Sequence, residues 1–329
     1  MLLLANGLLK RMSSYAANIT NSDAYWTKRR NELLATIEQR GLPTFFSTFS
    51  FANIHWPDLH RLMPGPQSTT RSQRYKNVLN NPHIVDWYYG HRLEVFIKMF
   101  FVELLQSKWY FYRHERQSRD AIHTHGVCRL ENDPDIAILA TVVYKGKLKE
   151  KLFPLTENNM NEFSSFINII KLDREAESRI VTYVDTLVTA MNNKEIPANP
   201  VVPDPHPCCI DIQLLDDELY DNDYIELVNC TQRHICRING YCRSKKKNME
   251  NQCRYGFPFE KNNKTKIIFK ENKNKNINTE VCLARNDPFM NQHSRLIAHA
   301  WRANVDLSMI INYSAAVNYM VKYATKSNF

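Results

Sequence analysis

The first part of the chain switches between helical and strand-like spacing of its apolar side chains. In Ser22–Arg40, apolar residues recur every three or four positions behind a serine and an aspartate that can cap a helix, so a helix is predicted there. Gly41 and Pro43 end it. Thr44–Ser50 (TFFSTFS) then alternates and is rich in aromatic residues, which predicts a strand.

Four further stretches have helical spacing. Ile54–Met63 is predicted to form a short helix behind a Trp-Pro start, and Pro82–Leu105 a long one with aromatic residues along its apolar side. Phe163–Met191 has the spacing of one or two helices. Asn304–Lys326 is also helix-like, and Asp306 lies near its expected start.

Two strand-like segments lie in the middle of the first half. Lys108–Arg116 (KWYFYRHER) and Ile122–Arg129 (IHTHGVCR) are rich in aromatic and β-branched residues. The five residues Gln117–Ala121 between them are polar enough to turn. We therefore predict an antiparallel hairpin that carries the His-Thr-His triplet on its second strand.

The overall charge points to a polyanionic partner. The 329 residues carry a formal net charge of +9 and are 11% aromatic, a combination that suits nucleic acid. The charge is uneven: Asp204–Glu226 is acidic without Lys or Arg, and Arg233–Lys275 is strongly basic. No apolar run has the roughly 18–20 residues of a membrane span, so no membrane partner and no signal peptide are expected.

His123 and His125 are candidate metal ligands. Alternate side chains of a strand share a face, so the two imidazoles point the same way and Thr124 points the opposite way. If the hairpin turns near Arg119, Glu115 lies directly across from His123, and Gln117 faces the same side. Glu115 is the preferred third ligand because an anionic oxygen suits Mg²⁺ or Mn²⁺, with Gln117 as the alternative. The other interpretation is an ordinary strand with two histidines.

Tyr319 and Tyr323 are candidate nucleophiles. They are four positions apart, so on a helix they share a face. A phenol has a pKa near 10 and attacks poorly until its oxyanion is stabilised, which Lys322 or Lys326 could do. The alternative is an amphipathic helix that buries two aromatic side chains.

A cysteine-rich segment is a candidate zinc site. Five potential ligands crowd into a short stretch, and the simplest set of four is His234, Cys236, Cys242 and Cys253, which leaves Cys230 aside. The spacing matches no standard zinc-finger pattern, and reduced cysteines that cluster by chance are the alternative. The chain also has no phosphate-binding loop and no Gly-x-Ser-x-Gly nucleophile turn, so ATP hydrolysis or serine chemistry by a known motif is not expected.

The motifs and their order resemble the N-terminal replication-initiator (Rep) region of Helitron rolling-circle transposases, often called the Helitron helicase-like domain. The resemblance extends over most of the chain. It rests on Pro43–Asn53, Trp56 and Leu59, Asn81-Pro82 with the long helix, Glu115-x-Gln117-x-Arg119 before His123-x-His125, the His234/Cys236/Cys242/Cys253 segment with Arg-Tyr-Gly-Phe-Pro, and Asn318-Tyr319-x-x-Lys322-Tyr323-x-x-Lys326.

The resemblance implies membership of the HUH endonucleases and an α+β fold. A central antiparallel sheet would carry the histidines, with flanking helices and a C-terminal tyrosine helix. His123 and His125, with Glu115 or Gln117, would hold Mg²⁺ or Mn²⁺ on the scissile phosphate of single-stranded DNA. Tyr319 and Tyr323 would attack it and form a 5′-phosphotyrosine, while Arg119, Lys322 and Lys326 would contact DNA.

The resemblance and the proline-rich stretch Ile196–Pro207 together predict a division of the chain. An N-terminal helical extension (1–40) precedes a nuclease core (41–195) and a linker (196–210). An acidic and basic Cys/His insertion with a zinc module (211–280) follows, and a tyrosine-helix segment (281–329) completes the core. Full-length Helitron proteins continue into a helicase domain, so this chain is expected to be a fragment that lacks it. Nuclear localisation is expected from the DNA substrate.

Three functions compete at this point. The first is a metal- and tyrosine-dependent enzyme that nicks and transfers single-stranded DNA in Helitron transposition. The second is a catalytically decayed or co-opted Rep-derived module that only binds DNA. The third is a metallohydrolase that uses His123 and His125 with water as the nucleophile. The Arg-Asp-Ala-Ile tract before the triplet and the polar Thr124 depart from the family pattern.

Overall fold

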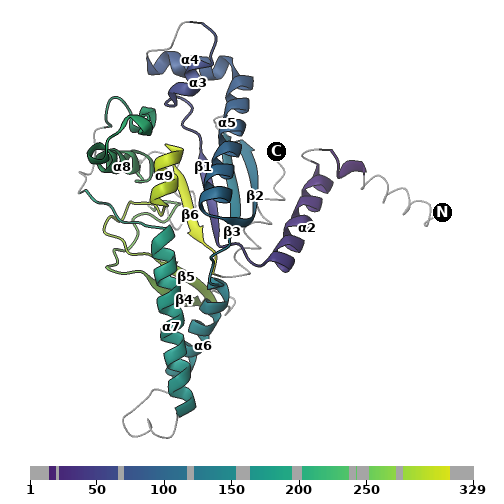
Figure 1. Cartoon of the computed structure of the whole chain (residues 1–329), viewed down its shortest axis with the longest axis vertical. Helices are drawn as coiled ribbons and strands as arrows, with labels where there is room; N and C mark the ends of the chain where they lie inside the picture. Colours follow the sequence, from purple (N-terminus) through teal and green to yellow (C-terminus); the bar gives the residue numbers. More distant parts are fainter. Residues whose placement is uncertain are drawn as a thin grey trace, which may run out of the picture.

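The computed structural model describes most of the chain and has a mixed α+β fold (Figure 1). The described residues are 15–19, 22–65, 70–116, 122–152, 164–194, 202–236, 242, 252–271 and 277–311. Across these ranges there are eight α-helices, a four-stranded antiparallel sheet and a separate two-stranded sheet. Within the same ranges, no helix has the length and apolar character needed to cross a membrane.

The four-stranded sheet has the order β2-β3-β1-β6, and each neighbouring pair is antiparallel. Its strands are β1 (Phe45–Ser50), β2 (Ser107–Arg116), β3 (Ile122–Leu130) and β6 (Val305–Met309). The predicted strand at Thr44–Ser50 and both strands of the predicted hairpin are confirmed. The strand β1 therefore lies between the hairpin and a segment more than 250 residues further along the chain.

One face of this sheet packs on the main hydrophobic core. Phe45 and Phe49 of β1 point to this side, where they meet α5 (Pro82–Phe96) and the π-helix η1 (Ile97–Leu104) that continues it. The short helices α3 (Pro57–Arg61) and α9 (Arg295–Trp301) also contribute to this core. The long helical stretch predicted at Pro82–Leu105 and the short one around Pro57 are thus confirmed.

The opposite face of the sheet is covered in part by α2 (Asp23–Arg40), the helix predicted near the N-terminus. Its Ser22 cap accepts a hydrogen bond from the backbone N–H of Tyr25, which satisfies one of the free donors of the first turn. Leu33 and Ile37 pack against this face, and the Trp26 ring stacks under the Arg113 guanidinium of β2 at 3.7 Å.

A helical pair extends from the sheet region. α6 (Ile136–Leu152) packs along α7 (Ser164–Leu187), and the two-stranded sheet of β4 (Lys266–Glu271) and β5 (Ile277–Cys282) lies against α7 (Figure 1). A Cβ atom on Gly146 would lie 2.4 Å from Cβ of Asp173, so only glycine permits this approach of the two helices. α4 (Arg71–Asn80), with its Thr70–Gln73 capping box, precedes α5.

A buried charge network joins the acidic segment to the sheet. Asp223 lies on α8 (Asp217–Thr231), and its carboxylate accepts two hydrogen bonds from the guanidinium of Arg302, the residue that follows α9. Nε2 of His299 lies 2.7 Å from the same carboxylate. Burial opposes ionisation of Asp223, but the hydrogen bonds and charges of Arg302 and His299 hold its pKa below the usual value. This acidic residue is therefore not part of a solvated charge run.

One predicted element is wrong. The segment that begins at Asn304 was expected to be helical, but Val305–Met309 forms the strand β6 and pairs with β1. The reason is the pairing with β1, which in this register buries both Val305 and Leu307 on the core face. The remainder of that predicted helix, including Tyr319 and Tyr323, lies outside the described residues.

The predicted linker at residues 196–210 is described only from residue 202 onward. Its end is packed, because Cys208 belongs to the main core and the backbone carbonyl of Pro207 accepts a hydrogen bond from Arg302. The insertion predicted at 211–280 also touches this core through Leu227 of α8. The proposed division into domains remains a prediction.

Replacement of Asp223 by asparagine should strongly destabilise the fold. The side chains of Asp223 and Arg302 are 8% and 5% exposed, so the substitution leaves a buried guanidinium without its counter-charge, at a loss of about 3 kcal/mol or more. Urea unfolding measures the change. Asp221→Asn is the matched control, because Asp221 pairs with Arg295 on the exposed side of the same helix and should lose less than about 1 kcal/mol. Equal effects of the two substitutions would contradict a structural role for the buried network.

Candidate functional site

Strand pairing places the predicted metal ligands on one face of the sheet. Glu115 of β2 is the direct partner of His123 of β3, as the hairpin spacing predicted. Ser50 of β1 is the partner of His123 on the other side, and Thr48 is the partner of His125. Because directly paired residues share a face, the two imidazoles, the carboxylate and two hydroxyls lie side by side on the face that α2 partly covers.

The three predicted ligands are in contact. The carboxylate oxygen Oε2 of Glu115 lies 2.9 Å from Nε2 of His125, and the rings of His123 and His125 meet edge to face with centroids 4.7 Å apart. The side chains of His125 and Glu115 are 11% and 22% exposed, so the group is shielded yet reachable from solvent. Two imidazole nitrogens and one carboxylate oxygen form a donor set that fits Mn²⁺ or Mg²⁺.

The electrostatics keep His123 neutral. Burial, and to a lesser degree the neighbouring His125, lowers the pKa of His123 to about 4, although Glu115 opposes the shift. A neutral imidazole retains the lone pair that a metal ion needs. At neutral pH, His123 therefore requires no deprotonation before it can bind a cation.

Thr124, the middle residue of the triplet, has a structural explanation. Its side chain turns to the core face and is fully buried. There its hydroxyl oxygen lies 2.7 Å from the Tyr89 hydroxyl of α5 and 2.8 Å from Nδ1 of His114. The Thr124 hydroxyl thus serves as hydrogen-bond partner to both Tyr89 and His114, and an apolar side chain at this position would leave those two groups without it.

Several predicted site residues cannot be placed. The sequence positions of Gln117 and Arg119 fall between β2 and β3, and those of Tyr319, Lys322, Tyr323 and Lys326 fall after β6. All six residues are outside the part of the chain that the structure describes. Their proposed roles remain predictions. Conversely, sequence reasoning missed Ser50, whose Oγ lies 3.2 Å from Nδ1 of His123. The order of the strands would have indicated it, because Ser50 ends the strand that pairs with the His-Thr-His segment.

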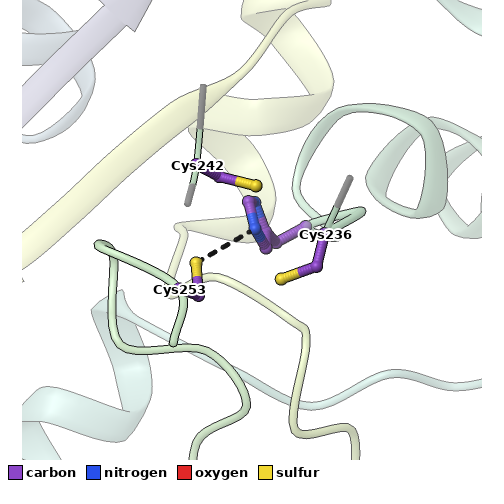
Figure 2. Close-up of side chains that lie close together, drawn as sticks. Cys236, Cys242 and Cys253 are labelled. Atoms are coloured by element: carbon purple, nitrogen blue, oxygen red, sulfur yellow. Dashed lines mark hydrogen bonds between the residues drawn. The ribbon is translucent and has the colours of Figure 1, made fainter. Parts of the chain in front are cut away.

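The four predicted zinc ligands come together at a second place. Ligand atoms of His234, Cys236, Cys242 and Cys253 all lie within 4.8 Å of one another. Figure 2 shows Cys236, Cys242 and Cys253 gathered at one place. Sγ of Cys253 lies 3.4 Å from Nε2 of His234. A tetrahedral zinc site places such atoms roughly 3.5–3.8 Å apart, so a small contraction around an ion would complete it. The cluster could hold a metal such as zinc.

Metal binding at this cluster would have to displace protons from its thiols. Burial, followed by the adjacent thiols of Cys253 and Cys242, raises the pKa of Cys236 to about 11. Burial also lowers the pKa of His234, whose ring stacks on Phe257. A metal ion would stabilise the thiolates and use the neutral imidazole. Cys230, the fifth candidate, is not among the grouped ligands.

Hydrogen bonds and an ion pair at His234 and the two residues before it connect the cluster to the rest of the fold. The backbone N–H of His234 donates to the carbonyl of Phe289, and Arg233 forms a 2.7 Å ion pair with Asp287. The backbone N–H of Asn291 donates to the carbonyl of Gln232, where α8 ends. These bonds connect His234, the first ligand in the sequence, to the end of α8 and to the loop before α9.

Comparison with known protein families gives one match. Residues 4–128 match the family described as "Helitron helicase-like domain at N-terminus". The matched stretch includes α2, β1, the long helix and the strands that carry Glu115, His123 and His125. The match confirms a Helitron helicase-like domain over these residues, and the Rep and HUH assignment remains a prediction. The Cys/His cluster and the tyrosines lie beyond the matched residues. Neither a curated protein nor a solved structure gives a significant match.

Purified chain reconstituted with zinc under reducing conditions should retain one equivalent of zinc through the His234, Cys236, Cys242 and Cys253 cluster. Cys253→Ser should lose most of it, because removal of one of four ligands leaves a weak site. Release of zinc on denaturation, measured with a chromogenic chelator, gives the stoichiometry. Cys209→Ser is the control, since this cysteine lies outside the cluster. Zinc retention unchanged by Cys253→Ser, or no zinc in the unsubstituted chain, would disprove the site.

Proposed function

We propose that this chain is a metal-dependent and tyrosine-dependent endonuclease and strand transferase that nicks single-stranded DNA in rolling-circle Helitron transposition, with an HUH-type centre. His123, His125 and Glu115 would bind Mg²⁺ or Mn²⁺, with Gln117 as the alternative oxygen ligand. Tyr319 and Tyr323 would be the nucleophiles. Arg119, Lys322 and Lys326 would contact the DNA backbone.

The observation that carries the proposal is the shared face of three donor groups. His123, His125 and Glu115 come from two paired strands, and one carboxylate oxygen is already 2.9 Å from an imidazole nitrogen. All three lie within the stretch that matches the Helitron helicase-like domain. The positive net charge is consistent with a DNA partner.

The proposed reaction is a transesterification that needs no external energy source. The phenolic oxygen of one tyrosine forms a bond to the scissile phosphorus, and the bond from phosphorus to the 3′ oxygen breaks. The products are a 5′-phosphotyrosine and a free 3′-hydroxyl, which receives the proton that the phenol loses. A bound divalent cation would neutralise phosphate charge during the attack. Because the phosphodiester energy is retained in the phosphotyrosine, a 3′-hydroxyl can later reverse the step and join strands.

The biological setting follows from this activity. A helicase domain, normally fused in Helitron proteins, would supply the unwound strand, so we propose that this chain acts with such a domain. DNA as the substrate places the proposed site of action in the nucleus.

Incubation with a labelled single-stranded oligonucleotide library and Mn²⁺, followed by a denaturing gel, tests the proposal. A slowly migrating covalent protein–DNA band is expected. It should vanish in the Tyr319→Phe/Tyr323→Phe double variant, and His123→Ala should reduce it to background because one metal ligand is lost. Tyr110→Phe is the matched control, since this tyrosine is 44% exposed on the hairpin strand next to β3 and should leave the band unchanged.

Two other outcomes have clear meanings. Binding of DNA by a folded chain without cleavage or adduct would contradict the enzyme and support a decayed or co-opted Rep-derived binding module. Cleavage without any covalent band, insensitive to the tyrosine substitutions but lost in His123→Ala, would instead indicate a metallohydrolase that uses water.

A further inference from the structure

A chain of side-chain hydrogen bonds leads away from His123 into the interior. Nδ1 of His123 lies 3.2 Å from Oγ of Ser50, and the Ser50 hydroxyl donates to Oδ1 of Asn304 at 3.4 Å. The amide nitrogen Nδ2 of Asn304 donates to the backbone carbonyl of Thr231 at 2.7 Å and to Oε1 of Gln232 at 3.3 Å. The chain thus connects the strand β3, the end of β1, the residue before β6 and the end of α8.

The direction of every bond in this chain is fixed from its far end. A backbone carbonyl can only accept, so the atom of Asn304 that faces Thr231 must be its NH₂ group. The Gln232 amide is fixed in the same way, because its Nε2 donates to the carbonyl of Ala303 at 3.2 Å. The oxygen Oδ1 of Asn304 therefore faces Ser50, and among the described residues the Ser50 hydroxyl is the donor that reaches it.

The orientation of the Ser50 hydroxyl determines which nitrogen of the His123 imidazole carries the proton. Once the Ser50 hydroxyl donates to Asn304, its oxygen is left to accept, and Nδ1 of His123 must carry the proton that it accepts. In a neutral imidazole the other nitrogen, Nε2, then holds the lone pair. The reverse arrangement would leave the hydroxyl donating to Nδ1 and Oδ1 of Asn304 without that proton.

We propose that Ser50 and Asn304 are positioning residues that lock His123 in the tautomer with a proton on Nδ1, so that Nε2 is presented as a metal ligand. The proposal rests on the metal role of His123 in the proposed function. Hydrogen bonds to the far nitrogen of a ligating histidine commonly orient the ring, and their loss typically lowers metal affinity by about 10- to 100-fold. Here the partner is a neutral hydroxyl, oriented in turn by an amide.

The backbone holds these side chains in place independently. The N–H of Ser50 donates to the carbonyl of Asn304 at 3.0 Å, and the indole nitrogen of Trp301 donates to the carbonyl of Ser50 at 2.8 Å. Neither bond uses the Ser50 hydroxyl. Substitution of Ser50 by alanine therefore keeps the local backbone pairing. It should yield a folded protein that lacks only the hydrogen bonds of the Ser50 hydroxyl.

Two measurements on the whole chain test the proposal. Long-range proton–nitrogen NMR spectra of the metal-free, ¹⁵N-labelled protein report which nitrogen of His123 is protonated, with its signals assigned by their loss in His123→Gln. Binding of Mn²⁺, followed by electron paramagnetic resonance, reports affinity. We expect protonated Nδ1 in the unsubstituted chain, a mixed tautomer and an affinity about 10-fold or more weaker in Ser50→Ala, and rescue in Ser50→Thr.

Asn304→Ala should change the tautomer in the same direction, because the Ser50 hydroxyl then becomes free to donate to Nδ1. Ser47→Ala is the matched control, since Ser47 lies on the same strand but on the core face, and neither readout should change. Protonated Nε2 in the unsubstituted chain, or an unchanged tautomer in Ser50→Ala, would overturn the proposal. Absence of Mn²⁺ binding together with protonated Nδ1 would instead refute the proposed metal centre, and so separates the two failures.

Discussion

The antiparallel pairing of β1 with β3 and of β3 with β2 is the constraint on which the candidate site depends. Successive residues of a strand alternate between two faces, so this register sends Phe45 and Phe49 into the main core and leaves His123 and His125 on the other side. A shift by one residue in β3 would bury both imidazoles and bring Thr124 out. The large apolar burial on the core face therefore also fixes where the imidazoles and the Glu115 carboxylate meet.

The second constraint is the arrival of β6 beside β1 from the far end of the sequence. It brings Asn304 within hydrogen-bond distance of Ser50, and it places Arg302 where it meets Asp223 of α8. The acidic segment is thereby anchored to the sheet by a buried ion pair and by the contact of Leu227 with the main core. The end of α8 leads directly into the Cys/His cluster, so the two candidate metal sites are built on one continuous framework.

Local pattern was enough to predict part of this arrangement. The hairpin spacing placed Glu115 across from His123, and the crowding of four ligand residues identified the Cys/His cluster. Pairing between distant segments could not be predicted in the same way. Val305–Met309 is short enough to fit either a strand or the start of a helix, and only its pairing with β1 decides. Ser50, Asn304 and the Asp223–Arg302 pair were missed for the same reason, since no local spacing indicates a partner 79 or 254 positions away.

The proposed metal centre at His123, His125 and Glu115 is the central claim, and anomalous X-ray scattering tests it most directly. Crystals of the chain soaked in Mn²⁺ would be measured on both sides of the manganese absorption edge. The proposal predicts one strong anomalous peak between Nε2 of His123, the His125 ring and the Glu115 carboxylate, at roughly 2.0–2.3 Å from each ligand atom. A peak elsewhere, or none at this face while the Cys/His cluster is intact, would contradict it.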